Sequence, residues 1–345
     1  MFAEARQSAL TVRAQLLERP RALSDLADRL RASPPPFVMT CARGSSDNAA
    51  TYAKYLIETA LGIPVASHAP SVSSLSATRW RDLRGVLFIA ISQSGRSPDL
   101  VASARAAREA GALVLAIVND EESPLAAGAD VVAAMRAGPE RSVAATKSFV
   151  GALAAVALLV ADWTRDAALA RALEGLPSAL EEAWNLDWSQ ALPTIVAARN
   201  MYVVGRGLNL GVAAEVALKL KETCGLHAEA FSAAEVRHGP MAIVNAGFPL
   251  LMLEPTGVAA TGFDTLAHEM AARGAHVLWA RPGGSAAPSG GAGGPVHLAG
   301  VGPLHEAVAP IAAAVAAYRL IAEASVARGL DPDAPPHLSK VTETL

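Results

Sequence analysis

Short unbroken apolar runs alternate along this chain with longer stretches in which apolar residues recur at helical spacing. Apolar runs at Phe37–Cys41, Val86–Ile91 and Ala112–Val118 predict strands that are covered on both faces, because such strands need no regular polar positions. The stretches Asn48–Ala60 and Pro98–Ala110 follow two of these runs with the three-to-four-residue spacing of helices. Strands that alternate with helices in this way predict an α/β fold, with mainly parallel sheets flanked by helices.

The same pattern restarts in the second half of the chain. The sequence GALVL that begins at Gly111 recurs as GAHVL from Gly274, an offset of 163 residues. Arg43-Gly44 recurs as Arg206-Gly207 at the same offset, again directly after an apolar run. Two matches at one offset predict an internal duplication that gives two tandem domains of the same α/β type.

Proline and glycine positions set the expected domain boundaries. Pro20 divides the helical pattern of the first 33 residues, and three prolines from Pro34 end it. The glycine-rich stretch 282–294 predicts a flexible surface loop. We expect an N-terminal helical arm at 1–33, a first domain at 34–163, a helical connector at 164–192, a second domain at 193–328 and a tail at 329–345.

Composition narrows the class of protein. Hydrophobic residues make up 52% and charged residues 18% of the 345 residues, which indicates a compact fold and not a disordered chain. The net charge of −3 argues against a broad nucleic-acid surface.

The two cysteines, Cys41 and Cys224, have no CxxC neighbour, so neither a disulfide framework nor a cysteine metal site is expected. The first residues lack the apolar core of a signal peptide, and the longest apolar run, Phe149–Ala161, is short for a membrane span. We therefore expect a cytoplasmic protein without a membrane or nucleic-acid partner.

Hydroxyl and amide side chains gather where the second apolar strand ends. Ser92, Gln93, Ser94 and Ser97 lie between this strand and the next helix, at the edge where open α/β sheets bind ligands. The alternative is a polar loop in which Ser97 caps a helix that starts with proline. We favour a phosphate site for the whole cluster.

The turn after the first strand provides a second wall for this site. It contains Ser45 and Ser46, while Arg43 in the same turn fits either a ligand contact or an ion pair with a surface acid. Neither turn carries the nucleotide-binding motifs GxGxxG or GxxxxGK[ST]. The sequence therefore favours a small phosphorylated metabolite over a nucleotide as the ligand. No cofactor is expected.

A second group of chemically active side chains lies between residues 215 and 240. Lys219 and Glu222 are three residues apart on one predicted helix, so both can face one substrate, although an ordinary ion-paired surface has the same spacing. His227 and His238 follow, together with two acids, Glu229 and Glu235. Amine, carboxylate and imidazole groups suit proton transfer between adjacent sugar carbons. The two histidines lack a clear third ligand, so no metal is expected.

Several of these motifs resemble the SIS (sugar isomerase) family, in particular the isomerase half of glutamine–fructose-6-phosphate aminotransferase. The resemblance rests on SQSGRSPD, VAATK, EVALKLKE, HAEAFSAAEVRHGP and LSKVTETL. It implies two SIS-type domains and a homodimer whose active site is shared between subunits, with an amino sugar phosphate as the small-molecule substrate.

The resemblance also implies roles for individual residues. The phosphate and sugar binders would be Ser46, Ser92, Gln93, Ser94 and Ser97, and Val143 would contact the sugar through its backbone. Glu222 resembles the base that moves a proton between C1 and C2, and Lys219 its neighbour that positions the sugar hydroxyls. His238 resembles the ring-opening histidine of the partner subunit, and Lys340 the tail lysine that forms a Schiff base in the synthase.

Two departures from the synthase pattern point to one activity. Phe2 stands where the synthase has the cysteine nucleophile of its glutaminase domain, and Arg96 follows SQSG where the synthase has an acid. The expected function is therefore a glutaminase-free glucosamine-6-phosphate deaminase. An isomerizing aminotransferase without glutaminase, a fructosamine or galactosamine phosphate deaminase, and a non-catalytic sugar phosphate sensor remain the alternatives.

Overall fold

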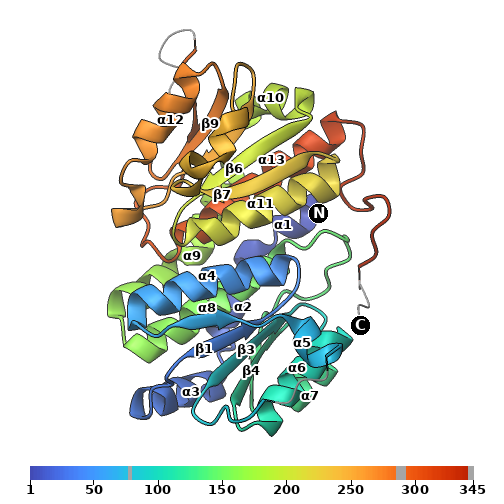
Figure 1. Ribbon diagram of the computed structural model, residues 1–345, viewed down its shortest axis with the longest axis vertical. Coiled ribbons are helices and arrows are strands. Elements are labelled where there is room, and N and C mark those ends of the chain that lie inside the picture. The colour runs from blue at the N-terminus through green and yellow to red at the C-terminus, as the bar shows by residue number, and fades with distance from the viewer. Residues whose placement is uncertain (77–79, 285–292, 341–345) are drawn as a thin grey trace. The chain divides into compact units, whose positions relative to one another are not determined.

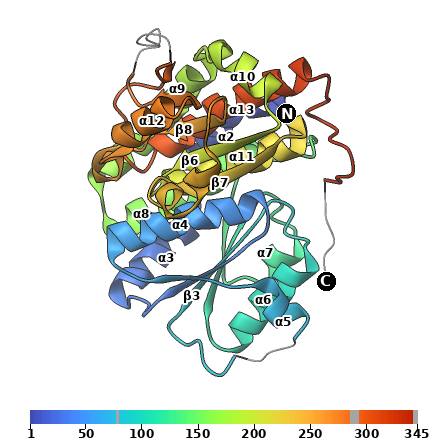
Figure 2. The same cartoon turned by 45° about the horizontal axis from the view of Figure 1, so that its top comes forward.

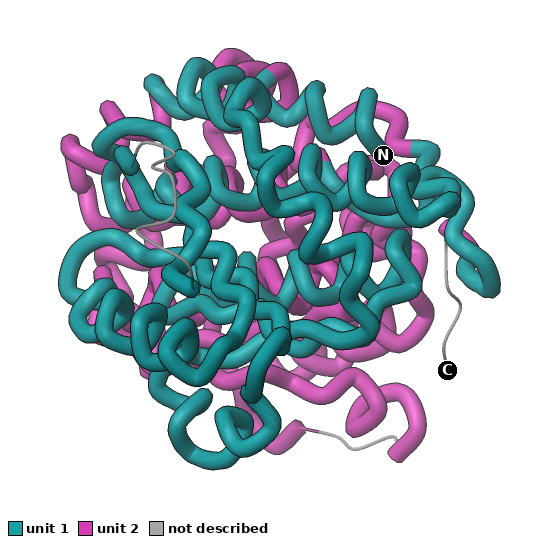
Figure 3. Tube along the Cα trace, turned by 90° about the horizontal axis from the view of Figure 1, so that it is seen from above, with its two compact units in different colours: residues 1–9, 141–146, 175–338 teal, residues 10–140, 147–174, 339–345 magenta. Residues whose placement is uncertain are grey.

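The computed structural model describes residues 1–76, 80–284 and 293–340, so most of the predicted 282–294 loop lies outside the described residues. The chain forms two compact units (Figure 3). Unit 1 contains residues 1–9, 141–146 and 175–338, and unit 2 contains residues 10–140, 147–174 and 339–345. The units are thus discontinuous in sequence, whereas the predicted domains were continuous. The predicted arm divides at residue 9, since helix α3 (Arg21–Ala32) buries Leu23, Leu26 and Leu30 as part of unit 2.

Unit 2 is built on a five-stranded parallel sheet. Its strands follow the order β2-β1-β3-β4-β5, so the chain reverses its direction of travel across the sheet between β1 and β3. Every residue of β3 is buried, as the apolar run at 86–91 predicts, and the polar Ser92 ends the strand. The strands are β1 (Val38–Cys41), β2 (Val65–Ser67), β3 (Leu87–Ser92), β4 (Leu113–Val118) and β5 (Val131–Ala134).

Helices cover both faces of this sheet. Helices α3, α4 and α8 lie on one face, and α5, α6 and α7 lie on the other (Figures 1 and 2). Besides α3, the helices that lie wholly or mostly in unit 2 are α4 (Ser45–Leu61), α5 (Pro70–Ser74), α6 (Pro98–Glu109), α7 (Pro124–Gly128), α8 (Lys147–Thr164) and α2 (Ser8–Leu17), and α9 (Ala167–Asn185) begins in unit 2 and continues into unit 1.

Unit 1 contains a second five-stranded parallel sheet, of order β10-β9-β8-β6-β7. Counted from the first strand of each sheet, both sheets have the same order, 2-1-3-4-5. Strands β4 and β9 are displaced by the 163 residues that the repeat predicts. The strands are β6 (Asn200–Gly205), β7 (His227–Ser232), β8 (Pro249–Leu253), β9 (His276–Arg281) and β10 (Val296–Ala299).

The helices of unit 1 pack its core. Helices α11 and α13 pack against each other, and an apolar cluster that includes Phe263, Met270 and Trp279 joins α12 to the sheet. The elements are α1 (Phe2–Ala5), α10 (Leu192–Ala197), α11 (Asn209–Cys224), α12 (Phe263–Ala272), α13 (Ala309–Ala327) and four 3-10 turns at Ser189–Ala191, Glu235–His238, Pro240–Ile243 and Gly257–Ala260.

Two differences from the predicted elements affect the candidate site. Helix α4 begins at Ser45, so Ser45 and Ser46 lie in its first turn and not in a loop. The segment after α11 forms strand β7, which the sequence pattern did not reveal because its residues are mostly exposed or half-buried.

Helices α8 and α13 are long and apolar enough to cross a membrane by length and composition. Most of each helix is buried inside the protein, as in the core helices of globular domains.

Candidate functional site

The polar cluster of unit 2 lies where the strand order of its sheet reverses. The turn of residues 42–44 follows β1 and the turn of residues 93–97 follows β3, and these strands are neighbours in the sheet. In open α/β sheets such a reversal opens a crevice at the carboxyl ends of the strands, where ligands bind. Both predicted walls of the phosphate site therefore lie at this crevice.

The SQSG turn holds its own shape with side-chain hydrogen bonds. Ser92 Oγ accepts a hydrogen bond from Gly95 N at 3.1 Å, and Ser94 Oγ accepts one from Arg96 N at 3.3 Å. Gly95 has φ +61°, and a Cβ atom there would lie 2.1 Å from Ser123 Oγ. Ser97 occupies the N-cap of α6, but its side chain makes no capping hydrogen bond. The structure thus does not support helix capping as the role of the Ser97 hydroxyl. Gln93, at the start of the turn, is half-buried.

Arg43 has a buried acidic partner. Its Nε and Nη2 atoms each lie 2.9 Å from Oδ2 of Asp99, a side chain with no exposed surface, and half of the Arg43 side chain remains exposed. The other carboxylate oxygen of Asp99 accepts a hydrogen bond from Leu100 N at 2.8 Å. This pair joins the turn after β1 to the first turn of α6, so it links the two walls. Sequence reasoning considered a surface acid for Arg43 and missed Asp99, although Asp99 ends the SQSGRSPD motif.

Unit 1 holds the second group on one face of α11. Lys219 Nζ forms an ion pair with Glu222 and lies 3.5 Å from Glu215 Oε1. Lys219 and Glu215 are fully buried, whereas about a fifth of the Glu222 side chain is exposed (21%). On an ordinary ion-paired surface all three charged groups would be exposed to solvent. Here two of the three are buried, and burial of a charged group costs several kcal/mol unless an oppositely charged partner compensates. The arrangement on α11 is therefore not an ordinary ion-paired surface. Sequence reasoning missed Glu215, which lies four residues before Lys219 in the EVALKLKE motif.

The histidines lie on exposed positions. His227 and Glu229 lie on β7, and Glu235 and His238 begin and end the 3-10 turn that follows. All four side chains are exposed. Within the described residues, no group of three histidine, cysteine or acidic side chains could hold a metal ion.

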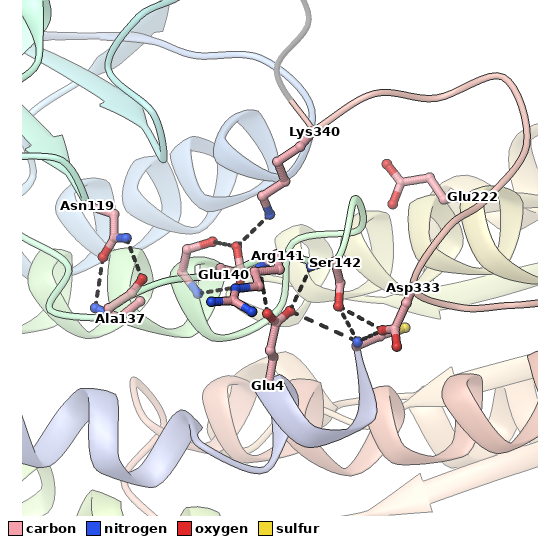
Figure 4. Close-up of polar contacts among 12 residues, drawn as sticks. Glu4, Asn119, Ala137, Glu140, Arg141, Ser142, Glu222, Asp333 and Lys340 are labelled. Carbon is pink, nitrogen blue, oxygen red and sulfur yellow. Dashed lines mark hydrogen bonds and ion pairs between the residues drawn. The ribbon is translucent and has the colours of Figure 1, made fainter.

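Lys340 has a fixed partner within unit 2. Its Nζ lies 3.1 Å from Glu140 Oε2 (Figure 4), and the buried Glu140 carboxylate also accepts hydrogen bonds from Ser148 N at 3.2 Å and Ser148 Oγ at 2.6 Å. Glu140 is therefore held by the first turn of α8. Sequence reasoning did not identify this residue.

The segment 141–146, which contains Val143, belongs to unit 1 and is held from two sides. Glu4 of α1 accepts hydrogen bonds from Arg141 N at 2.5 Å and Ser142 N at 3.2 Å (Figure 4). Ser142 Oγ donates to Asp333 at 2.8 Å, and Val143 N donates to the Asp333 carbonyl at 3.2 Å. The backbone N–H of Val143 is thus engaged by the C-terminal segment.

Neither cysteine is suited to nucleophilic chemistry. Both are buried, and burial raises the pKa of Cys41 to about 12 and also raises that of Cys224. A thiol with a raised pKa is not ionised at neutral pH, so both residues serve as packing groups.

The corresponding crevice of the second sheet lies between β6 and β8 and carries different groups. Asn209 begins α11, and its Nδ2 donates to the carbonyls of Leu253 and Glu254, each at 3.1 Å. The Glu254 carboxylate in turn lies 3.1 Å from Arg281 Nε, and burial raises its pKa. At this crevice the polar side chains therefore bind other groups of the protein. The crevice of the unit 2 sheet presents serine hydroxyls instead.

Comparison with known proteins decides the family. The model of the SIS domain matches residues 37–161 and 194–279, one segment in each half of the chain. The chain belongs to the SIS domain family. Each matched segment covers most of one five-stranded sheet, in agreement with the two-sheet α/β fold.

Similar proteins include aminotransferases of sugar phosphates. The chain is 33% identical over 317 residues to the glutamine–fructose-6-phosphate aminotransferase (isomerizing) of Symbiobacterium thermophilum, a match that covers 88% of this chain and 51% of that protein. It is 36% identical over 313 residues to the same kind of protein from Halobacterium salinarum, with 86% and 50% covered. The chain spans about half the length of these curated relatives.

Solved structures give the same family relationship. A protein assigned as a phosphosugar isomerase from Silicibacter pomeroyi DSS-3 has a TM-score of 0.88 and 40% identity, with 96% of this chain and 99% of that chain covered. The C-terminal domain of glucosamine-fructose-6-phosphate aminotransferase from Francisella tularensis has a TM-score of 0.80 and 26% identity, with 94% and 98% covered. A glucosamine-6-phosphate deaminase from Thermotoga maritima shares the fold, with a TM-score of 0.71 at 22% identity and 97% and 100% covered.

Proposed function

We propose that this protein is an enzyme of sugar phosphate metabolism that deaminates glucosamine 6-phosphate to fructose 6-phosphate and ammonia. The observation that carries the proposal is the Lys219–Glu222 pair on α11, in which a buried ammonium holds a carboxylate that keeps partial access to solvent. A carboxylate in this setting suits transfer of a proton between adjacent carbons of a sugar. The relationship to proteins named as phosphosugar isomerases and isomerizing aminotransferases supports the same chemistry.

In this proposal the turns that follow β1 and β3 anchor the substrate. The phosphate group binds at the turn of residues 92–97 and at Ser45 and Ser46, since the first turn of α4 offers backbone N–H groups as well as hydroxyls. Arg43, fixed by Asp99, adds a guanidinium beside this turn. The sugar then needs no nucleotide or metal to fix its charged end.

Residues on α11 and on the 3-10 turn after β7 supply the groups for the chemical steps. His238 assists ring opening, and the open-chain aldehyde then loses its C2 proton to Glu222, which returns a proton to C1. Because the C1 oxygen also takes up a proton and the C2 amine gives one up, the product of this shift has a hydroxyl group on C1 and an imine at C2. Water adds to the imine carbon, and the C–N bond breaks to give the ketone of fructose 6-phosphate and ammonia. Lys219 holds the C1 oxygen of the enolamine intermediate, and Lys340 and the backbone of Val143 contact the sugar.

The proposal includes a cytoplasmic homodimer in which His238 acts on the substrate of the partner subunit. The exposed position of His238 on its 3-10 turn is compatible with this role. Mixed dimers test it, because a Glu222→Gln chain and a His238→Ala chain would together rebuild one intact site. Random mixing of the two inactive variants should then restore about a quarter of wild-type activity, whereas a site built from one chain would recover none.

The identities of 33–36% to isomerizing aminotransferases favour a second candidate, in which the chain joins ammonia to fructose 6-phosphate and isomerises the product. The two candidates share the proton transfer and differ in the direction of the C–N bond step. Fructosamine or galactosamine phosphates remain alternative substrates of the first candidate. The direction of net turnover and a comparison of the three amino sugar phosphates separate these possibilities.

The deciding experiment incubates the purified protein with glucosamine 6-phosphate and measures ammonia and fructose 6-phosphate. Equal amounts of both products are expected, and binding without ammonia release would indicate a sugar phosphate sensor. Glu222→Gln should lower kcat by about 10²–10⁴-fold and leave the Kd for fructose 6-phosphate unchanged. Glu323→Gln, which breaks an ion pair with Arg319 elsewhere in unit 1, is the matched control.

A further inference from the structure

A tyrosine of α13 contacts the acidic group that lies behind the Lys219–Glu222 pair. The hydroxyl of Tyr318 donates a hydrogen bond to Glu215 Oε1 at 3.0 Å, and both side chains are completely buried. The residues are 103 positions apart in sequence and meet because α11 and α13 pack side by side. This contact has no part in the steps proposed above.

The same oxygen of Glu215 also faces the lysine. Lys219 Nζ lies 3.5 Å from Glu215 Oε1 and forms its closer ion pair with Glu222. Two carboxylates thus share one ammonium, and the ammonium takes a position that depends on how strongly each carboxylate attracts it. A hydroxyl that donates to Glu215 offsets part of its charge, and this weakens its pull on Lys219.

We propose that Tyr318 is a positioning residue that acts through Glu215 to keep the Lys219 ammonium on Glu222. Without the hydroxyl, Glu215 keeps its charge but loses a donor inside the protein. Lys219 then compensates by moving toward Glu215, and Glu222 loses the partner that fixes the direction of its carboxylate. The inference rests on the proposed role of Glu222 in proton transfer and adds a residue outside the motif that contains Glu222.

Tyr318→Phe tests this inference because it removes the hydroxyl and keeps the ring that fills the core. We expect kcat to fall about 10-fold, equivalent to about 1.4 kcal/mol in the barrier, with KM within a factor of two. Ser325→Ala is the matched control. Ser325 is also buried on α13, and its hydroxyl donates to the Thr223 carbonyl of α11 at 2.7 Å, directly beside Glu222 in sequence. Ser325→Ala therefore removes a hydrogen bond between α11 and α13 and leaves the contacts of Glu215 and Lys219 in place.

The measurement combines thermal unfolding with two rates. Deuterium uptake from solvent into fructose 6-phosphate reports the proton transfer, and ammonia release from glucosamine 6-phosphate reports the full reaction. Tyr318→Phe should lower both rates, whereas Ser325→Ala should lower the unfolding temperature by a similar amount and neither rate. In a double-mutant cycle, Tyr318→Phe should have no further effect once Glu215→Gln is present, since the tyrosine then has no carboxylate to act on.

Equal effects of Tyr318→Phe and Ser325→Ala on the two rates, or additive effects in the cycle, would overturn the inference. Deuterium uptake without ammonia release by the wild-type protein would overturn the deaminase proposal alone, because the uptake rates of the variants would still decide the role of Tyr318. Absence of both activities in the wild-type protein would refute both.

Discussion

Gly95 offers a direct test of the phosphate anchor, because two separate costs oppose any side chain there. Its φ of +61° is a left-handed conformation, and a Cβ atom would lie 2.1 Å from Ser123 Oγ and 2.6 Å from Ser123 Cβ. The conformation alone costs about 1–2 kcal/mol for a residue other than glycine. The overlap adds about 1–3 kcal/mol or moves the SQSG turn.

Gly62 is a control that carries only the first of these costs. It ends α4 in the same unit with φ +68°, and no atom lies within 4 Å of the position its Cβ would take. Gly95→Ala should therefore lower the free energy of unfolding by about 1–3 kcal/mol more than Gly62→Ala does. Urea unfolding of the two variants measures this difference.

Binding measurements separate stability from function. If the turn moves and one charge-assisted hydrogen bond to the phosphate is lost, about 1.5–3 kcal/mol of binding free energy goes with it. The Kd for fructose 6-phosphate should then rise about 10–100-fold in Gly95→Ala and stay unchanged in Gly62→Ala. Titration calorimetry at a temperature where both variants are folded gives these values. Equal Kd values for the two variants would refute the assignment of the turn as the anchor.

Three further substitutions test other contacts. Asp99→Asn leaves Arg43 without its buried carboxylate, so the free energy of unfolding in urea should fall by about 1–3 kcal/mol. The Kd for fructose 6-phosphate should rise as well. An unchanged Kd would show that the pair only joins the two turns. Glu140→Gln keeps the acceptor for the first turn of α8 but loses the ion pair, so trypsin should cleave after Lys340 about 5–30-fold faster, as measured by intact mass. Burial raises the pKa of Glu4, but hydrogen bonds from the backbone of residues 141 and 142 outweigh it, and the net pKa lies below the ordinary 4.5. A carboxyl with a lowered pKa stabilises the fold above pH 4.5, and this stabilisation is lost as the pH falls through the pKa of the folded state. The difference in the free energy of unfolding between wild type and Glu4→Gln should therefore shrink and vanish in acid.

The pattern of the sequence was sufficient for the strands that are buried on both faces. The apolar runs at 86–91 and 112–118 leave no polar position, and β3 and β4 form where these runs predict them. Strand β7 was missed because it lies at the edge of its sheet, where β6 is its one partner among the described residues, and its sequence HAEAFS mixes exposed polar and small residues. Discontinuous units could not be predicted either, since contacts between segments far apart in sequence assign α1 and residues 141–146 to unit 1.

For the candidate site, motifs predicted the residues that lie close together in sequence and failed for those that meet only in the fold. Lys219 and Glu222 share a helix face at a spacing that sequence alone reveals. Tyr318 lies within a helix whose apolar sequence explains it as a core residue, and nothing in that helix indicates a carboxylate 103 residues earlier as its partner. Glu140 is similar, because its partners come from α8 and from the tail.

The two sheets of the chain show how one topology can serve different chemistry. Both sheets reverse their strand order at the same point, and this reversal creates a crevice that a ligand can use. In unit 2 the crevice presents hydroxyls and an arginine that a buried aspartate fixes. In unit 1 the side chain of Asn209 at the corresponding place binds the backbone at the end of β8. The charged groups of unit 1 lie instead along α11, where burial against α13 holds a lysine between two carboxylates. The two copies thus keep the same strand order and differ in the polar side chains that they place at the corresponding crevices.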